Sequence, residues 1–326
     1  MPPPAVLPMA APAVPDSPAT LGPVTVPMGA APRVATGGRS AVPLGPAARD
    51  AWARLRLRRG PGELRAMLLA LVLTPGSSRE RQCWIEETDD LDGAAFLMGD
   101  LETLPAHARL PALEAVLAHA ALLPLADRQD LAPAVRRVMC ADGRVRPLDR
   151  LKLLLVRHRL AGVQVPQRAS LREADPDLGH LPLALRIAAA DVSAFLARLV
   201  PQADPRVRVC AAGAGWHARV VTALWGSSPH PPACQVPDTD ALVRALQTLR
   251  HLDWMRRPLL VRVWLDALHA LAEQVGAPAA SGGVSGLGGL DLDGAEALRI
   301  ACGLLDTPVP PELSRLFAEL PGAPAA

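Results

Sequence analysis

The stretch Cys140-Ala141-Asp142-Gly143-Arg144-Val145, followed shortly by Asp149, lies between two segments with helical periodicity. An Asp-Gly pair often ends a helix, because glycine adopts a left-handed backbone conformation without steric cost. Pro147 suits the first turn of a following helix, where its missing N–H leaves no hydrogen bond unmade. The stretch therefore predicts two helices joined by an Ala-Asp-Gly turn, the second beginning at Pro147.

Apolar residues recur at steps of three and four on both sides of this turn, as expected for one buried face of a helix. Before the turn these residues are Leu131, Val135, Val138 and Met139, and after it they are Leu148, Leu151, Leu154 and Leu155. Four basic residues of the second helix are expected to point mostly outward: Arg150, Lys152, Arg157 and Arg159. A degraded version of the turn is expected near residues 290–296, where Asp293 and Glu296 have the spacing of a capping box.

The composition favours helices throughout the chain. Half of the 326 residues are hydrophobic, but the aromatic residues are only six Trp and three Phe, with no Tyr. The core must therefore consist of Leu, Val and Ala, of which Leu and Ala are strong helix formers. We expect an all-α protein.

The distribution of Pro, Gly and apolar residues predicts a domain order. Residues 1–46 form a Pro/Ala-rich tract, which we expect to be a disordered arm, because frequent proline prevents helix formation. Two helical-bundle modules are predicted at 47–164 and 181–318, with a polar linker at 165–180 between them. A disordered tail is expected at 319–326.

Charge and cysteine content exclude several classes of protein. A net charge of +2 and a pI near 8.4 are too mild for a dedicated nucleic-acid-binding protein, so no nucleic-acid partner is expected. The five cysteines are widely spaced and form no C-x-x-C pair, which argues against a disulfide framework or a zinc knuckle. No cofactor is expected. Lys152 is the only lysine, and the excess of arginine is interpreted as a coding bias.

The hydrophobic segments are too short to cross a membrane. The longest unbroken apolar run, residues 66–73, is far below the roughly 20 residues that a spanning helix needs. The N-terminus lacks a charged segment followed by an apolar one, so it does not match a secretory signal. We expect a cytoplasmic protein that reaches the inner membrane only through a partner.

Several short stretches together resemble a known family. They are Arg65-Ala66-Met67-Leu68-Leu69-Ala70-Leu71, Arg79-Glu80-Arg81-Gln82, Leu104-Pro105, Arg109-Leu110-Pro111, Ala141-Asp142-Gly143-Arg144-Val145, Arg157-His158, Leu242-Val243-Arg244-Ala245-Leu246, Pro258-Leu259-Leu260, Ala295-Glu296-Ala297-Leu298-Arg299 and Pro308-Val309-Pro310-Pro311. This set resembles the C-terminal soluble region of HtpX/CAAX-protease-like membrane zinc metallopeptidases of proteobacteria. That region is similar to TerB-like (tellurite-resistance B) helical modules, so the resemblance implies two such modules here.

The chain departs from that family in its chemistry. The family's peptidase part has membrane helices and an H-E-x-x-H helix, in which two His bind zinc and the Glu acts as base. None of the eight His residues here forms that motif, so we expect no enzyme activity of this kind. The second module lacks the Ala-Asp-Gly turn, which leaves Glu296 at the family's acidic position, and Asp149 stands where Glu is usual.

Asp142 and Asp149 are the candidate metal ligands, because carboxylates at a helix–turn–helix can bind a hard cation. The simpler alternative is that Asp142 shapes the turn and Asp149 stabilises the N-terminus of the next helix. The candidate interaction surface for an acidic partner comprises Arg136, Arg137, Arg144, Arg146 and Arg150. Its alternative is a solvated helix end. A second basic run beside Trp52, with Arg54, Arg56, Arg58 and Arg59, suits a solvated face better than lipid or nucleic acid.

These patterns support three hypotheses on function. The leading one is a non-catalytic interaction or regulatory module that acts beside a membrane protease or another protein. The first alternative is a metal-responsive, TerB-like stress protein that uses Asp142 and Asp149. The second alternative is a detached fragment of a membrane zinc metallopeptidase, in which case Met1 is not the true start.

Overall fold

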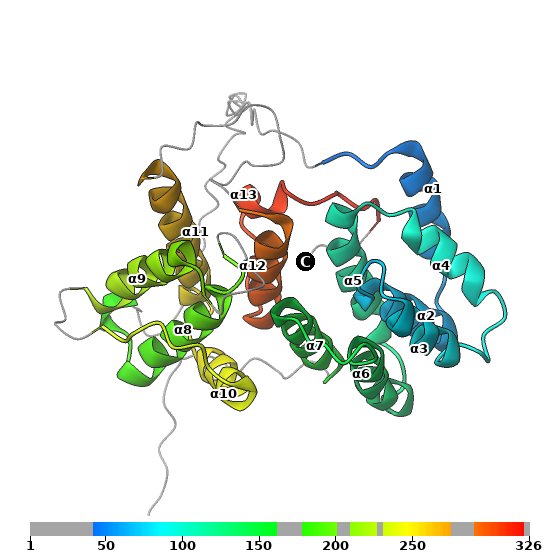
Figure 1. Ribbon diagram of the computed structural model, residues 1–326, viewed down its shortest axis with the longest axis horizontal. Helices are drawn as coiled ribbons and strands as arrows, with labels where there is room; N and C mark the ends of the chain where they lie inside the picture. Colours follow the sequence, from blue (N-terminus) through cyan, green and yellow to red (C-terminus); the bar gives the residue numbers. More distant parts are fainter. Residues whose placement is uncertain (1–41, 162–177, 201–208, 227–230, 275–289, 323–326) are drawn as a thin grey trace, which may run out of the picture. The chain divides into compact units, whose positions relative to one another are not determined.

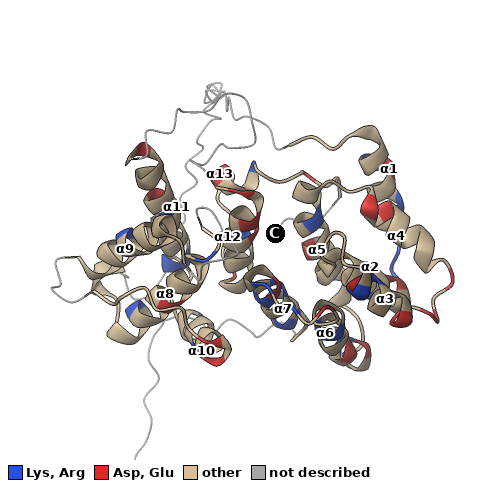
Figure 2. Ribbon diagram, viewed as in Figure 1, with Lys and Arg blue, Asp and Glu red and all other residues tan. Residues whose placement is uncertain are grey.

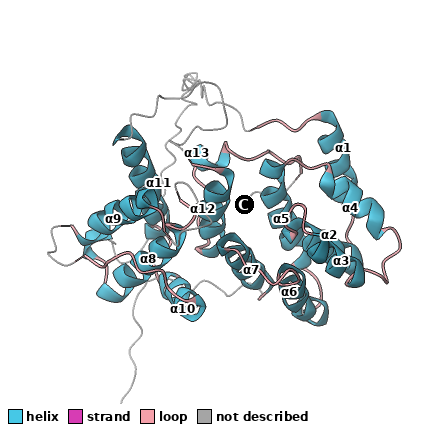
Figure 3. Cartoon of the chain, viewed as in Figure 1, coloured by secondary structure: helices cyan, strands magenta, loops and turns pink. Residues whose placement is uncertain are grey.

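The computed structural model describes residues 42–161, 178–200, 209–226, 231–274 and 290–322. Within these ranges all regular secondary structure is helical, and the β pairing consists of one isolated bridge between Val42 and Ala318 (Figure 3). The prediction of an all-α fold is confirmed. Residues 1–41 of the predicted arm lie outside the described residues. Residues 165–177 of the predicted linker also lie outside them. The predicted module boundaries stay predictions.

Seven α-helices precede the first internal gap in the described residues (Figure 1). They are α1 (Pro46–Leu55), α2 (Pro61–Val72), α3 (Ser78–Glu86), α4 (Ala94–Glu102), α5 (Ala106–Ala120), α6 (Leu125–Met139) and α7 (Pro147–Leu160).

The remaining elements follow that gap. They are a short 3₁₀ turn, η1 (Leu178–His180), and the helices α8 (Leu183–Leu196), α9 (Ala211–Trp225), α10 (Thr239–Leu249), α11 (Arg256–Gln274), α12 (Leu292–Leu304) and α13 (Pro311–Ser314).

Helix starts follow local sequence signals. Proline occupies the first turn of α1, α2 and α7, where no intrahelical donor is needed. Ser77 caps α3 by accepting a hydrogen bond from the Glu80 N–H, and Asp238 caps α10 through the Ala241 N–H at 2.7 Å. The start of α12 differs from the prediction, because Asp291 rather than Asp293 is the cap and accepts from the Gly294 N–H at 2.7 Å.

Helix α2 is the central element of the helices before the gap. Its residues 66–72 are all buried, and it packs against α3, α4, α5 and α6. The indole of Trp84 on α3 donates a hydrogen bond to the Ala66 carbonyl oxygen at 2.9 Å. The continuous apolar sequence of α2 thus has neighbours on several sides, which explains why it lacks a polar face.

The helices after the gap are held by a buried network of tryptophans. Helix α8 packs against α9 and α10, and α9 packs against α11. The Trp216 indole donates to the Trp264 carbonyl oxygen, and the Trp264 indole donates to Ser193 Oγ, each at 2.9 Å. Helix α9 approaches α8 so closely at Gly213 that a Cβ there would lie 2.1 Å from the Ala197 carbonyl oxygen.

Helix α12 is buried around its whole circumference. Every residue from Gly294 to Leu304 is buried, and the helix contacts α7, α8 and α13 (Figure 1). Gly303 lets it approach α7, since a Cβ there would lie 3.0 Å from Leu155 Cδ1. The helix therefore links elements from both of the predicted modules.

Two buried ion pairs accompany this packing. Lys152 Nζ lies 2.8 Å from Glu296 Oε2, and the Arg299 guanidinium binds Glu114 with Nη2–Oε2 at 2.7 Å and Nε–Oε2 at 3.0 Å. Arg299 also lies over the Phe317 ring, 4.7 Å from its centroid. The prediction that Lys152 points outward is therefore wrong, because α12 covers that side of α7 and supplies a carboxylate.

The ends of the described chain pack together. Leu44 is buried, and the Trp52 indole donates to the Pro321 carbonyl oxygen at 3.2 Å. Leu320 is also buried, and the Ala318 N–H donates to the His107 carbonyl oxygen at 3.1 Å. Residues 319–322 belong to the segment that is predicted to be a disordered tail. In the structure they are held by contacts with α1 and its surroundings.

Candidate functional site

The turn between α6 and α7 has the predicted form. Helix α6 ends at Met139, and the Gly143 N–H donates to the Cys140 carbonyl oxygen at 3.0 Å. Gly143 has φ +76°, a left-handed conformation that glycine adopts without strain. Asp142 Oδ1 accepts a hydrogen bond from the Arg144 N–H at 2.8 Å, which closes the turn.

Asp149 acts at the start of α7. Its Oδ2 accepts a hydrogen bond from the Arg146 N–H at 2.9 Å, and the Arg146 Nε lies 3.5 Å from the same oxygen. The carboxylate is buried and lies in the first turn of the helix, where the exposed N–H groups favour negative charge. Both candidate metal ligands therefore have one carboxylate oxygen engaged by a backbone amide.

A third carboxylate, which no sequence pattern marks as a site residue, lies near this pair. Glu80 on α3 is buried, and its Oε2 accepts a hydrogen bond from the Thr74 N–H at 2.5 Å. Burial raises the pKa of Glu80, the hydrogen bonds with Thr74 oppose that rise, and the charges of Asp142 and Asp149 add to it. The spacing of Ser77 and Glu80 signals a capping box, but it does not indicate that Glu80 turns toward residue 74.

No metal site is evident within the described ranges, where no three His, Cys, Asp or Glu side chains are arranged to hold an ion. The hypothesis of metal binding by Asp142 and Asp149 stays a prediction.

Two of the five predicted interaction arginines are engaged within the protein. The Arg137 guanidinium binds the Glu87 carboxylate, with Nη2–Oε2 at 2.9 Å, and lowers the pKa of that carboxyl. Arg146 contacts the Thr74 hydroxyl in addition to Asp149. These contacts orient both side chains toward α2 and α3, so neither guanidinium is fully available to a partner.

The other three arginines form what we call the arginine surface: Arg136, Arg144 and Arg150. Arg136 lies in the last turn of α6, Arg144 in the connecting turn and Arg150 in the first turn of α7. Arg136 and Arg144 are exposed and Arg150 is half-buried. None of the three side chains has an ion pair or hydrogen bond with another described residue. Figure 2 shows that further basic residues continue along α7.

Comparison with known proteins finds no relative of this chain. No protein-family model matches the chain, and neither the curated proteins nor the solved structures contain a significant match. Within the described part of the chain, no helix combines the length and the apolar character needed to cross a bilayer.

Proposed function

We propose that this chain is a non-catalytic interaction module that binds an acidic surface of a partner protein through Arg136, Arg144 and Arg150. The observation that carries the proposal is the charge of the arginine surface, with whose side chains no carboxylate among the described residues forms an ion pair. The neighbouring acidic groups are already used, because Asp142 closes the turn, Asp149 caps α7 and Glu87 binds Arg137.

The geometry suits recognition of carboxylates. Arginine presents a rigid planar set of donors that matches a carboxylate in a bidentate manner. The three side chains are attached to two helix ends and a turn with defined hydrogen bonds, so a partner would meet a preorganised scaffold. Val145, which is 44% exposed, lies in the same turn and provides an apolar contact among the charges.

The resemblance to the soluble region of membrane metallopeptidases supports a membrane protease as the partner class. In this proposal the chain works in the cytoplasm and reaches the membrane through that partner. The absence of an H-E-x-x-H motif in the sequence supports a role without peptidase chemistry.

A photo-crosslinking amino acid at position 145 tests the proposal in cells. The crosslinker is placed in the wild type, in Arg136→Glu/Arg144→Glu/Arg150→Glu and in the matched control Arg49→Glu/Arg219→Glu/Arg244→Glu. Both variants change the net charge equally, and the control side chains form no ion pair or hydrogen bond with another described residue. We expect a discrete adduct in wild type and control that is lost in the test variant.

Raising the salt concentration tests whether binding of the partner is electrostatic. Charge contacts at an exposed surface are screened over about 10 Å at 0.1 M ionic strength, so recovery of the partner should fall as salt rises. Equal adduct yields in the test variant and the control would show that the arginine surface does not bind the partner.

A further inference from the structure

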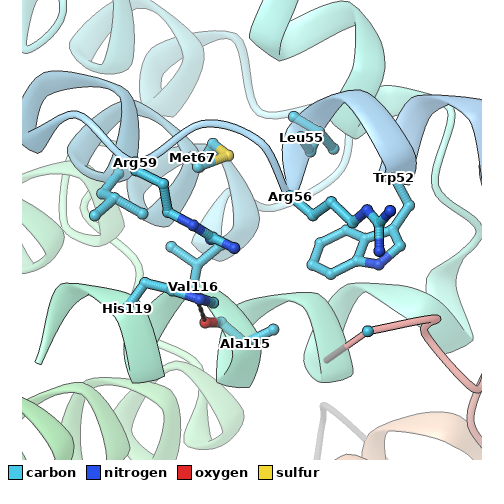
Figure 4. Close-up of a pocket in the computed structure, with 10 residues that line it drawn as sticks. Trp52, Leu55, Arg56, Arg59, Met67, Ala115, Val116 and His119 are labelled. Atoms are coloured by element: carbon cyan, nitrogen blue, oxygen red, sulfur yellow. Dashed lines mark hydrogen bonds between the residues drawn. The ribbon is translucent and has the colours of Figure 1, made fainter. Parts of the chain in front are cut away.

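A narrow crevice lies between α1, α2 and α5, apart from the helices α6 and α7 that carry the arginine surface (Figure 4). Its walls border about 300 Å³ of empty space that includes open solvent, and the room inside the crevice is about that of one water molecule. Its walls come from α1, the α1–α2 turn, α2, α5 and Gly322. The lining residues that matter for its chemistry are Trp52, Arg56, Arg59, Met67, Val116 and His119.

The floor of the crevice is apolar and fixed. Met67 and Val116 are 2% and 3% exposed, and Trp52 is held by its hydrogen bond to the Pro321 carbonyl oxygen. The His119 ring is oriented by a hydrogen bond between Nδ1 and the Ala115 carbonyl oxygen at 2.7 Å. An apolar floor lowers the local dielectric, which strengthens the interaction of an anion with charges at the rim.

Two guanidinium groups border this floor. In the same basic segment, Arg54 binds Asp100 and Arg58 binds Glu63, so those two charges are neutralised. The guanidinium groups of Arg56 and Arg59 have no ion pair or hydrogen bond with any described residue. Figure 4 shows Arg59 extending toward His119 at one end of the crevice, with Arg56 and Trp52 at the other.

Gly322 lies beside the guanidinium of Arg56. Its φ of +73° is a left-handed conformation, and a Cβ at this position would lie 2.7 Å from Arg56 Nη1. The backbone of residue 322 therefore passes directly beside the guanidinium. Only a glycine permits both the turn and this approach without displacing the arginine.

We infer that this crevice binds a phosphate group, either as inorganic phosphate or as the monoester of a small molecule. Two unpaired arginines supply a charge of +2, which matches the charge of about −1.5 to −2 that a phosphate monoester carries at pH 7 better than that of a single carboxylate. The planar donor sets of the arginines suit phosphate oxygens. The interior of the crevice is too small for a whole ligand, so the phosphate group lies at its open mouth and the rest of a ligand remains in solvent.

Isothermal titration calorimetry at fixed ionic strength tests this inference on the full chain. The titrants are inorganic phosphate, glycerol phosphate and acetate. We expect saturable binding of phosphate that is at least about tenfold tighter than that of acetate. Similar affinities for the two phosphates would identify the phosphoryl group as the recognised part, whereas tighter binding of glycerol phosphate would identify a monoester as the ligand.

Substitutions test whether phosphate binds at the crevice. Arg56→Gln/Arg59→Gln should weaken phosphate binding at least about tenfold, while the matched control Arg49→Gln/Arg244→Gln should bind like the wild type. Gly322→Ala keeps both arginines but displaces Arg56, so it should also weaken binding. Circular dichroism checks that each variant is folded. The inference is overturned if the wild type does not bind phosphate, or if Arg56→Gln/Arg59→Gln binds as tightly as the control.

Discussion

The ion pair between Glu114 and Arg299 should contribute strongly to stability when one partner is removed. Arg299 and Glu114 side chains are only 11% and 15% exposed, and three Nε/Nη2–carboxylate distances lie between 2.7 and 3.2 Å. Breaking a buried pair by removing one member costs about 3–5 kcal/mol, because it leaves an uncompensated charge. Residual contact with water places Glu114→Met near the lower end, at about 3 kcal/mol.

Arg299→Met should cost more than Glu114→Met. It leaves Glu114 unpaired and also removes the contact with Phe317, and a cation–π interaction contributes about 1 kcal/mol. The double variant Glu114→Met/Arg299→Met leaves no buried charge at this site, so we expect it to lose less than about 2 kcal/mol. The loss in the double variant should therefore be much smaller than the sum of the two single losses.

Urea unfolding followed by circular dichroism at 222 nm measures these free energies. Glu273→Met, on the exposed end of α11, is the control and should change stability by no more than about 0.5 kcal/mol. The reasoning is refuted if Glu114→Met costs less than about 1 kcal/mol, or if the single losses simply add in the double variant.

Three further predictions concern packing, thiol reactivity and pH. Gly213→Ala should lower the free energy of unfolding in urea by about 3 kcal/mol, because its Cβ would meet the Ala197 carbonyl oxygen at 2.1 Å. Gly99 has open space around it, so Gly99→Ala should raise the free energy of unfolding by about 0.5–1 kcal/mol. Equal effects of the two substitutions would contradict this packing. Burial raises the pKa of Cys302 to about 12, whereas Cys140 is exposed. Mass spectrometry after thiol labelling at pH 8 should therefore find Cys140 modified well before Cys302. Early labelling of Cys302 would disprove its burial. Burial lowers the pKa of His217 below its value of 6.5 in the unfolded chain, so the unfolded state takes up the proton first and the free energy of unfolding should fall as pH drops below about 6.5. His217→Gln should reduce that fall without abolishing it, because the pKa of His107 is lowered in the same way; identical pH profiles of unfolding free energy would exclude the His217 contribution.

Local patterns were sufficient to predict the α6–α7 segment. Leu148, Leu151 and Leu155 are buried on one face of α7, and the Ala-Asp-Gly turn ends α6 through Gly143 as expected. These features depend on interactions within a few residues, namely the helical repeat, a left-handed glycine and a proline in the first turn. The role of the candidate arginines in binding a partner stays a prediction.

The sequence could not reveal which of those arginines have partners. Arg137 binds Glu87, a residue 50 positions away that no local pattern relates to it. Arg136 is adjacent in sequence and identical in chemistry, yet its guanidinium has no such contact in the described structure. Their different roles follow from the packing of α3 against α6, which places Glu87 beside only one of them.

Packing between distant helices also explains why the prediction that Lys152 points outward is wrong. A charged residue on an amphipathic helix is normally placed on the solvent side, because an unpaired charge is costly to bury. That rule holds for an isolated α7, but α12 covers the side that carries Lys152 and supplies Glu296 from more than 140 residues away. The scarcity of polar residues on α12, whose other positions are mostly Ala, Gly, Leu and Ile, was the available signal that this helix is enclosed. In such a helix Glu296 and Arg299 need charged partners, which come here from Lys152 on α7 and Glu114 on α5.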